Sequence, residues 1–522
     1  MGTRERSDPP LEPALIRRNR SGRVEASSVR ATPVLEEIDV TVPSESGSTT
    51  SRTRVGPWLL MVGAVIMLSG LLFGYDQGVI AGALEGIQKS FNTSNTMTEI
   101  ITSWVTLGAL FGALVAGVLA DRIGRKITIM LAAGLFTLGA LLESLAPGTS
   151  VLVIGRLVVG FGVGVASVAA PLYAAEQAPS HLRGRFVSTY QLAITMGIFI
   201  AYLVDQALTN GSSWRLMLGV SAVPAVMLLI VIVPMPDTPR WLIKVNRRGD
   251  AEKALLKIQP DVDPKLELDD IETSARAEDE NRATWSEVFS KSLRKPLMVG
   301  VGLAVFQQIT GINAIIYYAD KIFAQAGFST PADQASATTW AIGGVNVLAT
   351  FIAVAYVDRF GRRPLLFVGL VGMSVSLTTV GIAFKFMGDA DTSGAGTGGP
   401  TTAGIVTLVA LVVFIASFAF SLGPVVWTVI NEIFPSRVRG RAVAIATAAN
   451  WGAAWLVSQF FLTLIDSIGT STTFWLFAAF AVVAYVWIWK KVPETKGRTL
   501  EEIELLWDAA DPVQAQRDSG TL

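Results

Sequence analysis

The chain alternates long apolar stretches with short polar loops, and twelve of the apolar stretches have the length of a transmembrane helix. A helix needs about 20 mostly apolar residues to cross the hydrocarbon core of a bilayer. Six stretches precede a charged middle segment and six follow it, at 57–80, 99–120, 126–146, 150–173, 187–208, 214–234, 296–324, 335–357, 363–387, 402–430, 440–465 and 471–491. The pattern predicts an all-α integral membrane protein built from two bundles of six helices.

The polar segments divide this pattern into domains. The first residues are rich in Arg, Pro, Ser and Glu and have no apolar core, so they are typical of a disordered tail and not of a signal peptide. The middle segment contains helical patches at 249–258 and 265–280. We therefore expect a tail at 1–54, an N-terminal bundle at 55–234, a helical linker at 235–295, a C-terminal bundle at 296–491 and a C-terminal segment at 492–522.

Lys and Arg residues predict the orientation. They gather in alternate loops, in the tail and in the linker, whereas the opposite loops hold few cations, such as Lys89, Lys321 and Lys385. Short loops rich in Lys and Arg face the cytoplasm. We expect a multi-pass protein of the inner (plasma) membrane, with both termini and the linker in the cytoplasm.

Composition excludes several classes of function. Charged residues make up 16% of the chain, against roughly 25% in soluble domains, and the mean hydropathy is +0.49. The net charge is zero, which gives no field for binding nucleic acid. The absence of cysteine excludes thiol catalysis, and the single histidine, His181, argues against a zinc site and against histidine-based catalysis. We expect a protein that is not an enzyme and that carries no metal or cofactor.

Two charged motifs occur twice, in matching places of the two halves. DRIGRK at 121–126 follows the second span, and DRFGRR at 358–363 follows the eighth. Glu176 with RGR at 183–185 follows the fourth span, and Glu432 with RGR at 439–441 follows the tenth. This order indicates two parallel repeats related by an axis along the membrane normal.

The acidic residues of these motifs favour a role beyond topology. Carboxylates contribute little to orientation, but at cytoplasmic helix ends they can pair with arginines of neighbouring loops and hold that side shut. The alternative is that the cations only set topology. The candidate gating residues are Asp121, Arg122, Arg125, Glu176, Arg185, Asp237, Arg240, Asp358, Arg359, Arg362, Glu432 and Arg439.

An ordered set of motifs over nearly all of 57–506 resembles the sugar porter family of the major facilitator superfamily, and its bacterial sugar–proton symporters in particular. The set includes Gly74-Tyr75-Asp76, Arg156 with GFGVG at 160–164, PLYAAEQAPSHLRGR at 171–185, PDTPRWL at 236–242, FQQITGINAIIYY at 306–318, GPVVW at 423–427, NEIFPSRVRGR at 431–441 and PETKGRTLEE at 493–502. The family usually has Glu-Ser where this chain has Asp237-Thr238. The resemblance implies the major facilitator fold and a central cavity open to one side at a time.

Amides in the seventh span are candidates for sugar contacts. Gln307, Gln308 and Asn313 offer donors and acceptors without a charge to desolvate. An intact helix would align them only roughly, and Gly311 between them is expected to loosen it. The resemblance implies sugar contacts at Gln191, Gln307, Gln308, Asn313, Trp427 and Asn450, and cavity-lining rings at Phe73, Tyr318, Phe418 and Trp451. Gly423-Pro424 predicts a helix break just before Trp427, which favours a sugar contact there, although a Trp in a membrane helix more often packs or anchors at the interface.

Asp76 is a carboxylate deep in the first span. Placing a charged side chain at the bilayer centre costs about 2.5 kcal/mol or more. Arg156 in the fourth span is the natural partner of Asp76. In proton-coupled members of the family an Asp and an Arg match these positions, so the resemblance implies proton symport. The alternative is a permanent structural ion pair in a passive uniporter.

The substrate is left open among several classes. Asn450, shorter than a Gln, favours a larger sugar, so we expect glucose or another hexose. A pentose, a polyol such as inositol, and a sugar sensor that binds without transport are alternatives. We expect a monomer in the lipid bilayer, with a monosaccharide and a proton as its partners, and a solvated His181 without a switching role.

Overall fold

The computed structural model describes residues 56–179, 182–209, 213–280, 284–389, 401–498, 500–508, 513 and 516. All of them belong to one compact unit, residues 53–522. The tail expected at 1–54 lies outside the described residues, as does His181. Within the described part, twelve helices are long and apolar enough to cross a membrane, which confirms the predicted all-α fold with twelve spans.

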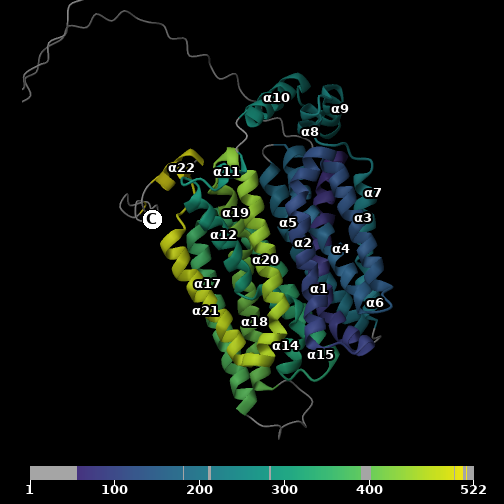
Figure 1. Ribbon diagram of the computed structural model, residues 1–522, viewed down its shortest axis with the longest axis vertical. Helices are drawn as coiled ribbons and strands as arrows, with labels where there is room; N and C mark the ends of the chain where they lie inside the picture. Colours follow the sequence, from purple (N-terminus) through teal and green to yellow (C-terminus); the bar gives the residue numbers. More distant parts are fainter. Residues whose placement is uncertain are drawn as a thin grey trace, which may run out of the picture. The chain divides into compact units, whose positions relative to one another are not determined.

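The N-terminal half contains the first six spans (Figure 1). Its sixth span is interrupted at Ser221, so that two helices share it. The elements are α1 (Pro57–Phe91), α2 (Asn95–Ile123), α3 (Arg125–Ser144), α4 (Thr149–Gln177), α5 (Arg183–Leu208), α6 (Trp214–Val220) and α7 (Ala222–Ile232).

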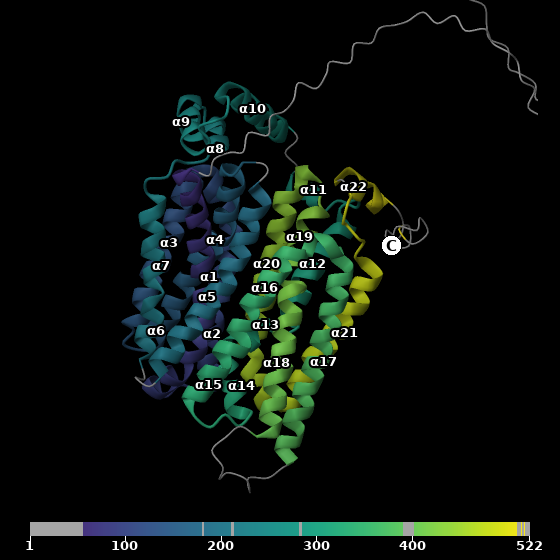
Figure 2. The same ribbon diagram turned by 180° about the vertical axis from the view of Figure 1, so that it is seen from behind.

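The C-terminal half contains the other six spans, seen from behind in Figure 2. Three of these spans are made of consecutive short elements, and the eighth contains a π-helix, Thr338–Gly344, that the sequence did not suggest. The elements are α12 (Arg294–Ile309), α13 (Ile312–Tyr317), α14 (Ala319–Gln325), α15 (Pro331–Ala337), α16 (Val345–Phe360), α17 (Arg362–Asp389), α18 (Thr402–Phe420), α19 (Leu422–Glu432), α20 (Ser436–Ile468) and α21 (Thr470–Lys491). A short helix, α22 (Leu500–Asp508), follows.

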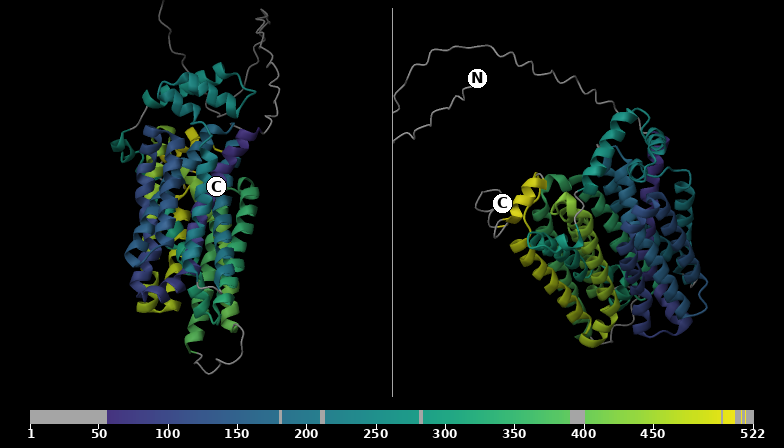
Figure 3. Two further views of the ribbon diagram at one scale, coloured as in Figure 1. Left: turned by 90° about the vertical axis from the view of Figure 1, so that its right-hand side faces the viewer. Right: turned by 45° about the horizontal axis from the view of Figure 1, so that its top comes forward.

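The linker forms four short helices at one end of the bundle, visible in teal in both views of Figure 3. They are α8 (Pro239–Lys244), α9 (Arg248–Ile258), α10 (Pro264–Glu280) and α11 (Trp285–Val288). The helical patches expected at 249–258 and 265–280 correspond to α9 and α10. We call this the linker end of the bundle, and the opposite end the far end.

Two breaks in the C-terminal half have distinct local causes. Gly311 between α12 and α13 has a φ of 93°, a left-handed conformation that glycine adopts at low cost. The break in the tenth span lies at Ser421, two residues before the expected Gly423-Pro424. Pro424 instead occupies the first turn of α19, where a missing N–H costs nothing. The expected position of that break was therefore wrong.

Small residues bring α1 and α5 into close contact. A Cβ built on Gly74 would lie 1.8 Å from the carbonyl oxygen of Ile194, and one built on Gly78 would lie 2.8 Å from that of Ile198. Helix association in lipid depends on such close packing, because lipid tails are as apolar as leucine. Glycines in the first span thus fix how deeply Asp76 sits in the N-terminal half.

The two halves are joined by polar contacts toward the far end. Glu99 on α2 accepts hydrogen bonds of 2.7 Å from both the backbone N and the Oγ1 of Thr463 on α20. One turn along α2, Ser103 Oγ donates to Gln459 Oε1 at 2.7 Å. Further bonds between the halves join Asn95 to Asp466, Tyr202 to Ile316 and Thr339 to Tyr202. These contacts close the far end in this conformation.

Candidate functional site

A buried ion pair joins α1 to α4. Arg156 Nη1 donates to Asp76 Oδ1 at 2.7 Å, and Arg156 Nε donates to the carbonyl oxygen of Ile101 on α2 at 3.1 Å. Arg156 is fully buried and Asp76 is 3% exposed. A pair this deep is stable only with good geometry, because both ions have lost their water. The structure thus brings together the two residues expected to form the proton-coupling pair.

A second carboxylate, which the sequence analysis missed, lies beside this pair. Glu143 on α3 is 1% exposed, and its Oε2 lies 3.8 Å from Arg156 Nη1. Glu143 could have been noticed as a charged residue within the predicted third span, 126–146. Its position near the end of that span is equally typical of a residue at the membrane interface. Only the packing of α3 on α4 shows that it faces Arg156.

Four amides from three helices, α12, α13 and α20, form one hydrogen-bonded cluster, which we call the amide cluster: Gln307, Gln308, Asn313 and Asn450. Asn313 Nδ2 donates to Gln308 Oε1 at 2.8 Å, across the break at Gly311. Asn450 Nδ2 donates to Gln307 Oε1 at 2.8 Å, and Gln308 Nε2 donates to Asn450 Oδ1 at 3.2 Å. All four are at most 7% exposed. The cluster offers several donors and acceptors and no formal charge.

The amide cluster is anchored at both sides. Gln307 Nε2 donates to the carbonyl oxygen of Leu422, at the start of α19, at 2.7 Å. On the other side, Gln77 Nε2 donates to Asn313 Oδ1 at 3.5 Å, from α1 in the opposite half. Gln77 was not among the residues predicted from the sequence, although it directly follows Asp76. Consecutive residues of α1 therefore contact the ion pair and the amide cluster.

The remaining expected sugar contacts are dispersed around this cluster. The rings of Phe73 and Trp451 pair across the two halves, with centroids 5.3 Å apart. Tyr318 is fully buried: its hydroxyl donates to the Ser458 carbonyl oxygen at 3.0 Å, and its ring stacks on Phe461. In this conformation Tyr318 packs against α20. The other three are half-buried on α5, α18 and α19: Gln191, Phe418 and Trp427.

At the linker end of the N-terminal half, the repeated motifs meet in one buried network. Arg125 binds Glu176 through two bonds of 3.0 Å, and its Nη1 lies 3.3 Å from Asp121. Thr238 Oγ1 donates to Glu176 at 2.6 Å. Asp237 accepts the backbone N–H of Arg125 at 3.1 Å. Burial raises the pKa of Asp237, and hydrogen bonds from backbone N–H groups oppose that rise.

The C-terminal half repeats this network. Arg362 Nη2 lies 2.8 Å from Glu432 Oε1. Glu494 accepts the backbone N–H groups of Arg362 at 3.0 Å and Arg363 at 2.9 Å, as Asp237 does at the start of α3. The match of Pro493-Glu494-Thr495 with Pro236-Asp237-Thr238 is therefore a third repeated motif, which the sequence analysis overlooked.

Other expected gating residues differ in their surroundings. Arg439 donates to the carbonyl oxygen of Phe434, and Arg359 stacks over Tyr356. Arg122 and Arg185 are exposed, and Arg240 is half-buried at the start of α8. The side chain of Asp358 lies outside the described residues. The pairs of Arg125 with Glu176 and of Arg362 with Glu432 thus each lie within one half.

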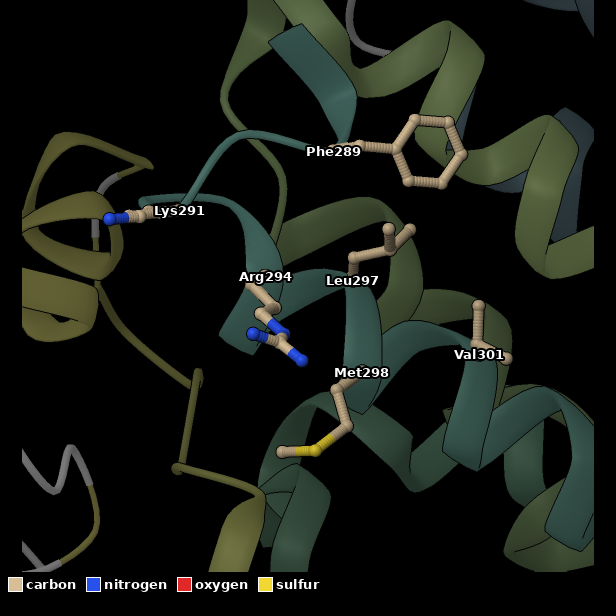
Figure 4. Close-up of a pocket in the computed structure, with 6 residues that line it drawn as sticks. All are labelled: Phe289, Lys291, Arg294, Leu297, Met298 and Val301. Atoms are coloured by element: carbon tan, nitrogen blue, oxygen red, sulfur yellow. The ribbon is translucent and has the colours of Figure 1, made fainter. Parts of the chain in front are cut away.

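A hollow of about 430 Å³ lies elsewhere, at the linker end of α12. Figure 4 shows its lining from the loop after α11 and the first turns of α12: Phe289, Lys291, Arg294, Leu297, Met298 and Val301. None of these residues belongs to the ion pair or to the amide cluster. The hollow is therefore a feature separate from the candidate site.

Known proteins match most of the chain. The family model described as "Sugar (and other) transporter" matches residues 62–507. The galactose-proton symporter of Escherichia coli (strain K12) is 40% identical over 438 residues, which cover 84% of this chain and 92% of that protein. The arabinose-proton symporter of Bacillus subtilis (strain 168) is 35% identical over 465 residues, covering 88% and 97% respectively.

Solved structures agree with this match. The xylose transporter XylE from E. coli, in an inward open conformation, superposes with a TM-score of 0.72 at 32% identity, covering 86% of this chain and 100% of that one. With its matching repeats, its twelve spans and these relatives, the chain belongs to the sugar transporter family of the major facilitator superfamily.

Proposed function

We propose that this protein imports a monosaccharide, glucose or another hexose, together with a proton by alternating access. The observation that carries the proposal is the buried Asp76–Arg156 pair, linked through Gln77 to an uncharged cluster of amides. A carboxylate that exchanges a proton and a set of neutral donors and acceptors are the two parts that sugar–proton symport requires. The relatives named as galactose- and arabinose-proton symporters support it.

The transport cycle follows from this arrangement. Protonation of Asp76 removes its charge and releases Arg156, so that the loaded carrier can reorient. When a sugar binds, its hydroxyls replace the hydrogen bonds that the residues of the amide cluster now make with one another. These residues are Gln307, Gln308, Asn313 and Asn450. Gln191, Trp427 and Phe418 complete the sugar contacts, with Phe73, Tyr318 and Trp451 as surrounding rings.

The conformation is inward-facing, with the linker end in the cytoplasm. The hydrogen bonds of Glu99 and Ser103 across the halves close the far end, and the similarity to inward open XylE supports this orientation. The ion pairs of Arg125 and Arg362 then stabilise each half while the cytoplasmic side opens and closes. The protein acts as a monomer of the inner membrane, with both termini in the cytoplasm.

Transport by protein in liposomes tests the proposal. An inward glucose gradient should alkalinise the external medium, and Asp76→Asn should abolish this alkalinisation while sugar exchange continues. Asp333→Asn, an exposed acid on α15, is the matched control and should behave as wild type. Uphill accumulation by Asp76→Asn would overturn the proton role and favour the passive uniporter. If a panel of unlabelled aldoses, pentoses included, fails to compete with glucose, the sugar proposal fails and inositol-like polyols are the next candidates.

A further inference from the structure

Glu143 occupies a prepared place beside the Asp76–Arg156 pair. A Cβ on Gly155 of α4 would lie 2.7 Å from Glu143 Cγ, so the glycine makes room for this side chain. Glu143 Oε1 and Arg156 Nη2 are both buried and have no hydrogen-bond partner. Helix packing that leaves polar atoms of opposite charge unsatisfied at one spot is costly. These atoms indicate that the pairing of Arg156 can change.

The charges around Glu143 do not balance when every group is ionised. Asp76 from α1 and Glu143 from α3 are two negative charges that face one guanidinium, Arg156 from α4. Arg215 on α6 is exposed, and its guanidinium donates to the carbonyl oxygen of Ala146, three residues beyond Glu143, so this cation stays outside the buried group.

The other neighbours add no full charge to this group. Tyr317 on α13 is buried and carries a neutral phenol, and α2 supplies the carbonyl oxygen of Ile101. An uncompensated charge in a dry helical core is expensive. One proton shared by the two carboxylates makes the group neutral, as in other sites where two carboxylates lie together.

We propose that Glu143 is a second proton-binding carboxylate, which shares the coupling proton with Asp76 while Arg156 pairs with whichever carboxylate is ionised. The inference rests on the proposed proton symport. In the present conformation Arg156 binds Asp76 at 2.7 Å, so the proton resides on Glu143. When that proton moves, the O–H bond of Glu143 breaks as an O–H bond forms at Asp76, and the ionised Glu143 replaces Asp76 as the counter-ion of Arg156.

Glu143 thereby makes the proton-loaded group neutral instead of positive. Without it, a protonated Asp76 would leave Arg156 as a buried, unpaired cation. The added negative charge strengthens proton binding, so the carrier holds its proton up to a higher pH. The arrangement predicts proton-coupled uptake that persists further into the alkaline range than it would with a neutral residue at this position.

The test compares the pH dependence of sugar-driven proton uptake in liposomes. Glu143→Gln keeps the size of the side chain and removes its charge, so the midpoint should move to lower pH by at least about one unit, a tenfold change in proton concentration. Glu143→Asp keeps the charge and should remain near the wild-type midpoint. An unchanged midpoint in Glu143→Gln would refute the inference, as would equal shifts in both variants, which would indicate packing alone.

Two further measurements separate this inference from the proposed function. If the wild type moves no protons with sugar, the symport proposal itself fails, whatever Glu143 does. Infrared difference spectra of the wild type with isotope-labelled glutamate should show a titrating protonated carboxyl whose band shifts with the label; a band that the label does not shift would refute proton binding at Glu143. The second measurement needs no variant of Glu143, so it decides the question even if Glu143→Gln does not insert.

Discussion

Glu99 holds the far end closed through a contact that the opposite conformation must break. Its carboxylate is 1% exposed and accepts bonds of 2.7 Å from both the N–H and the hydroxyl of Thr463 in the other half. Alternating access separates the halves at this end. Removing the carboxylate should therefore destabilise the closed far end and leave the open one unaffected.

The size of the effect follows from the two bonds. A hydrogen bond to a charged group contributes about 1.5–3 kcal/mol net. Two such bonds at the lower value give about 3 kcal/mol, and every 1.4 kcal/mol is a tenfold change in an equilibrium. Glu99→Ala should thus raise the ratio of far-open to far-closed protein roughly 100-fold, and Glu99→Gln, which retains one acceptor oxygen, should raise it less.

The absence of cysteine from the chain makes this ratio measurable. Ser103 is buried at the same contact between α2 and α20, one turn from Glu99. A single Ser103→Cys substitution gives a thiol that a membrane-impermeant maleimide reaches from the far side only when that end opens. The rate of labelling in proteoliposomes should rise in Glu99→Ala relative to the Ser103→Cys protein.

A matched control distinguishes the loss of the Glu99–Thr463 contact, which we call the latch, from a general effect of removing a charge at this end. Glu85, near the far end of α1, forms an exposed pair with Lys89 on its own helix, and such pairs contribute about 1 kcal/mol or less. Glu85→Gln should change labelling by only a few-fold. Equal labelling rates in Glu99→Ala and its parent, with sugar exchange intact, would refute the assignment of Glu99 as a latch.

Two further predictions concern packing and binding. Gly74→Ala should lower the melting temperature markedly, since the added Cβ meets the Ile194 carbonyl at 1.8 Å and overpacking costs about 1–3 kcal/mol or more. The control Gly134→Ala, with open space around it, should leave the melting temperature unchanged. Equal melting temperatures for the two variants would contradict the close approach of α1 and α5. Asn450→Ala removes a partner of Gln307 and of Gln308 and should weaken sugar binding about tenfold, the effect of roughly 1–2 kcal/mol of hydrogen bonding. Titration of sugar-induced tryptophan fluorescence measures this, with the exposed Thr378→Ala as control, and unaltered affinity would place the sugar elsewhere.

Much of the site could be predicted because a membrane makes polar residues conspicuous. Asp76, Arg156 and the pair Gln307-Gln308 stand out in apolar stretches, where lipid cannot satisfy them. Glu143 did not stand out, because it lies next to the end of its helix. Gln77 was missed for a different reason: its partner Asn313 is in the other half of the chain, and a contact over that separation leaves no local pattern.

The twelve spans and the repeat could be predicted without the structure, because both depend on local properties: the run length of apolar residues and the position of charged motifs at helix ends. Tertiary structure decided which polar side chains meet. Asn313 reaches Gln308 because Gly311 breaks the helix, and Glu143 faces Arg156 because Gly155 lets α3 approach α4. The direction in which a helix turns its polar residues depends on its neighbours, and these are known only once the helices have packed.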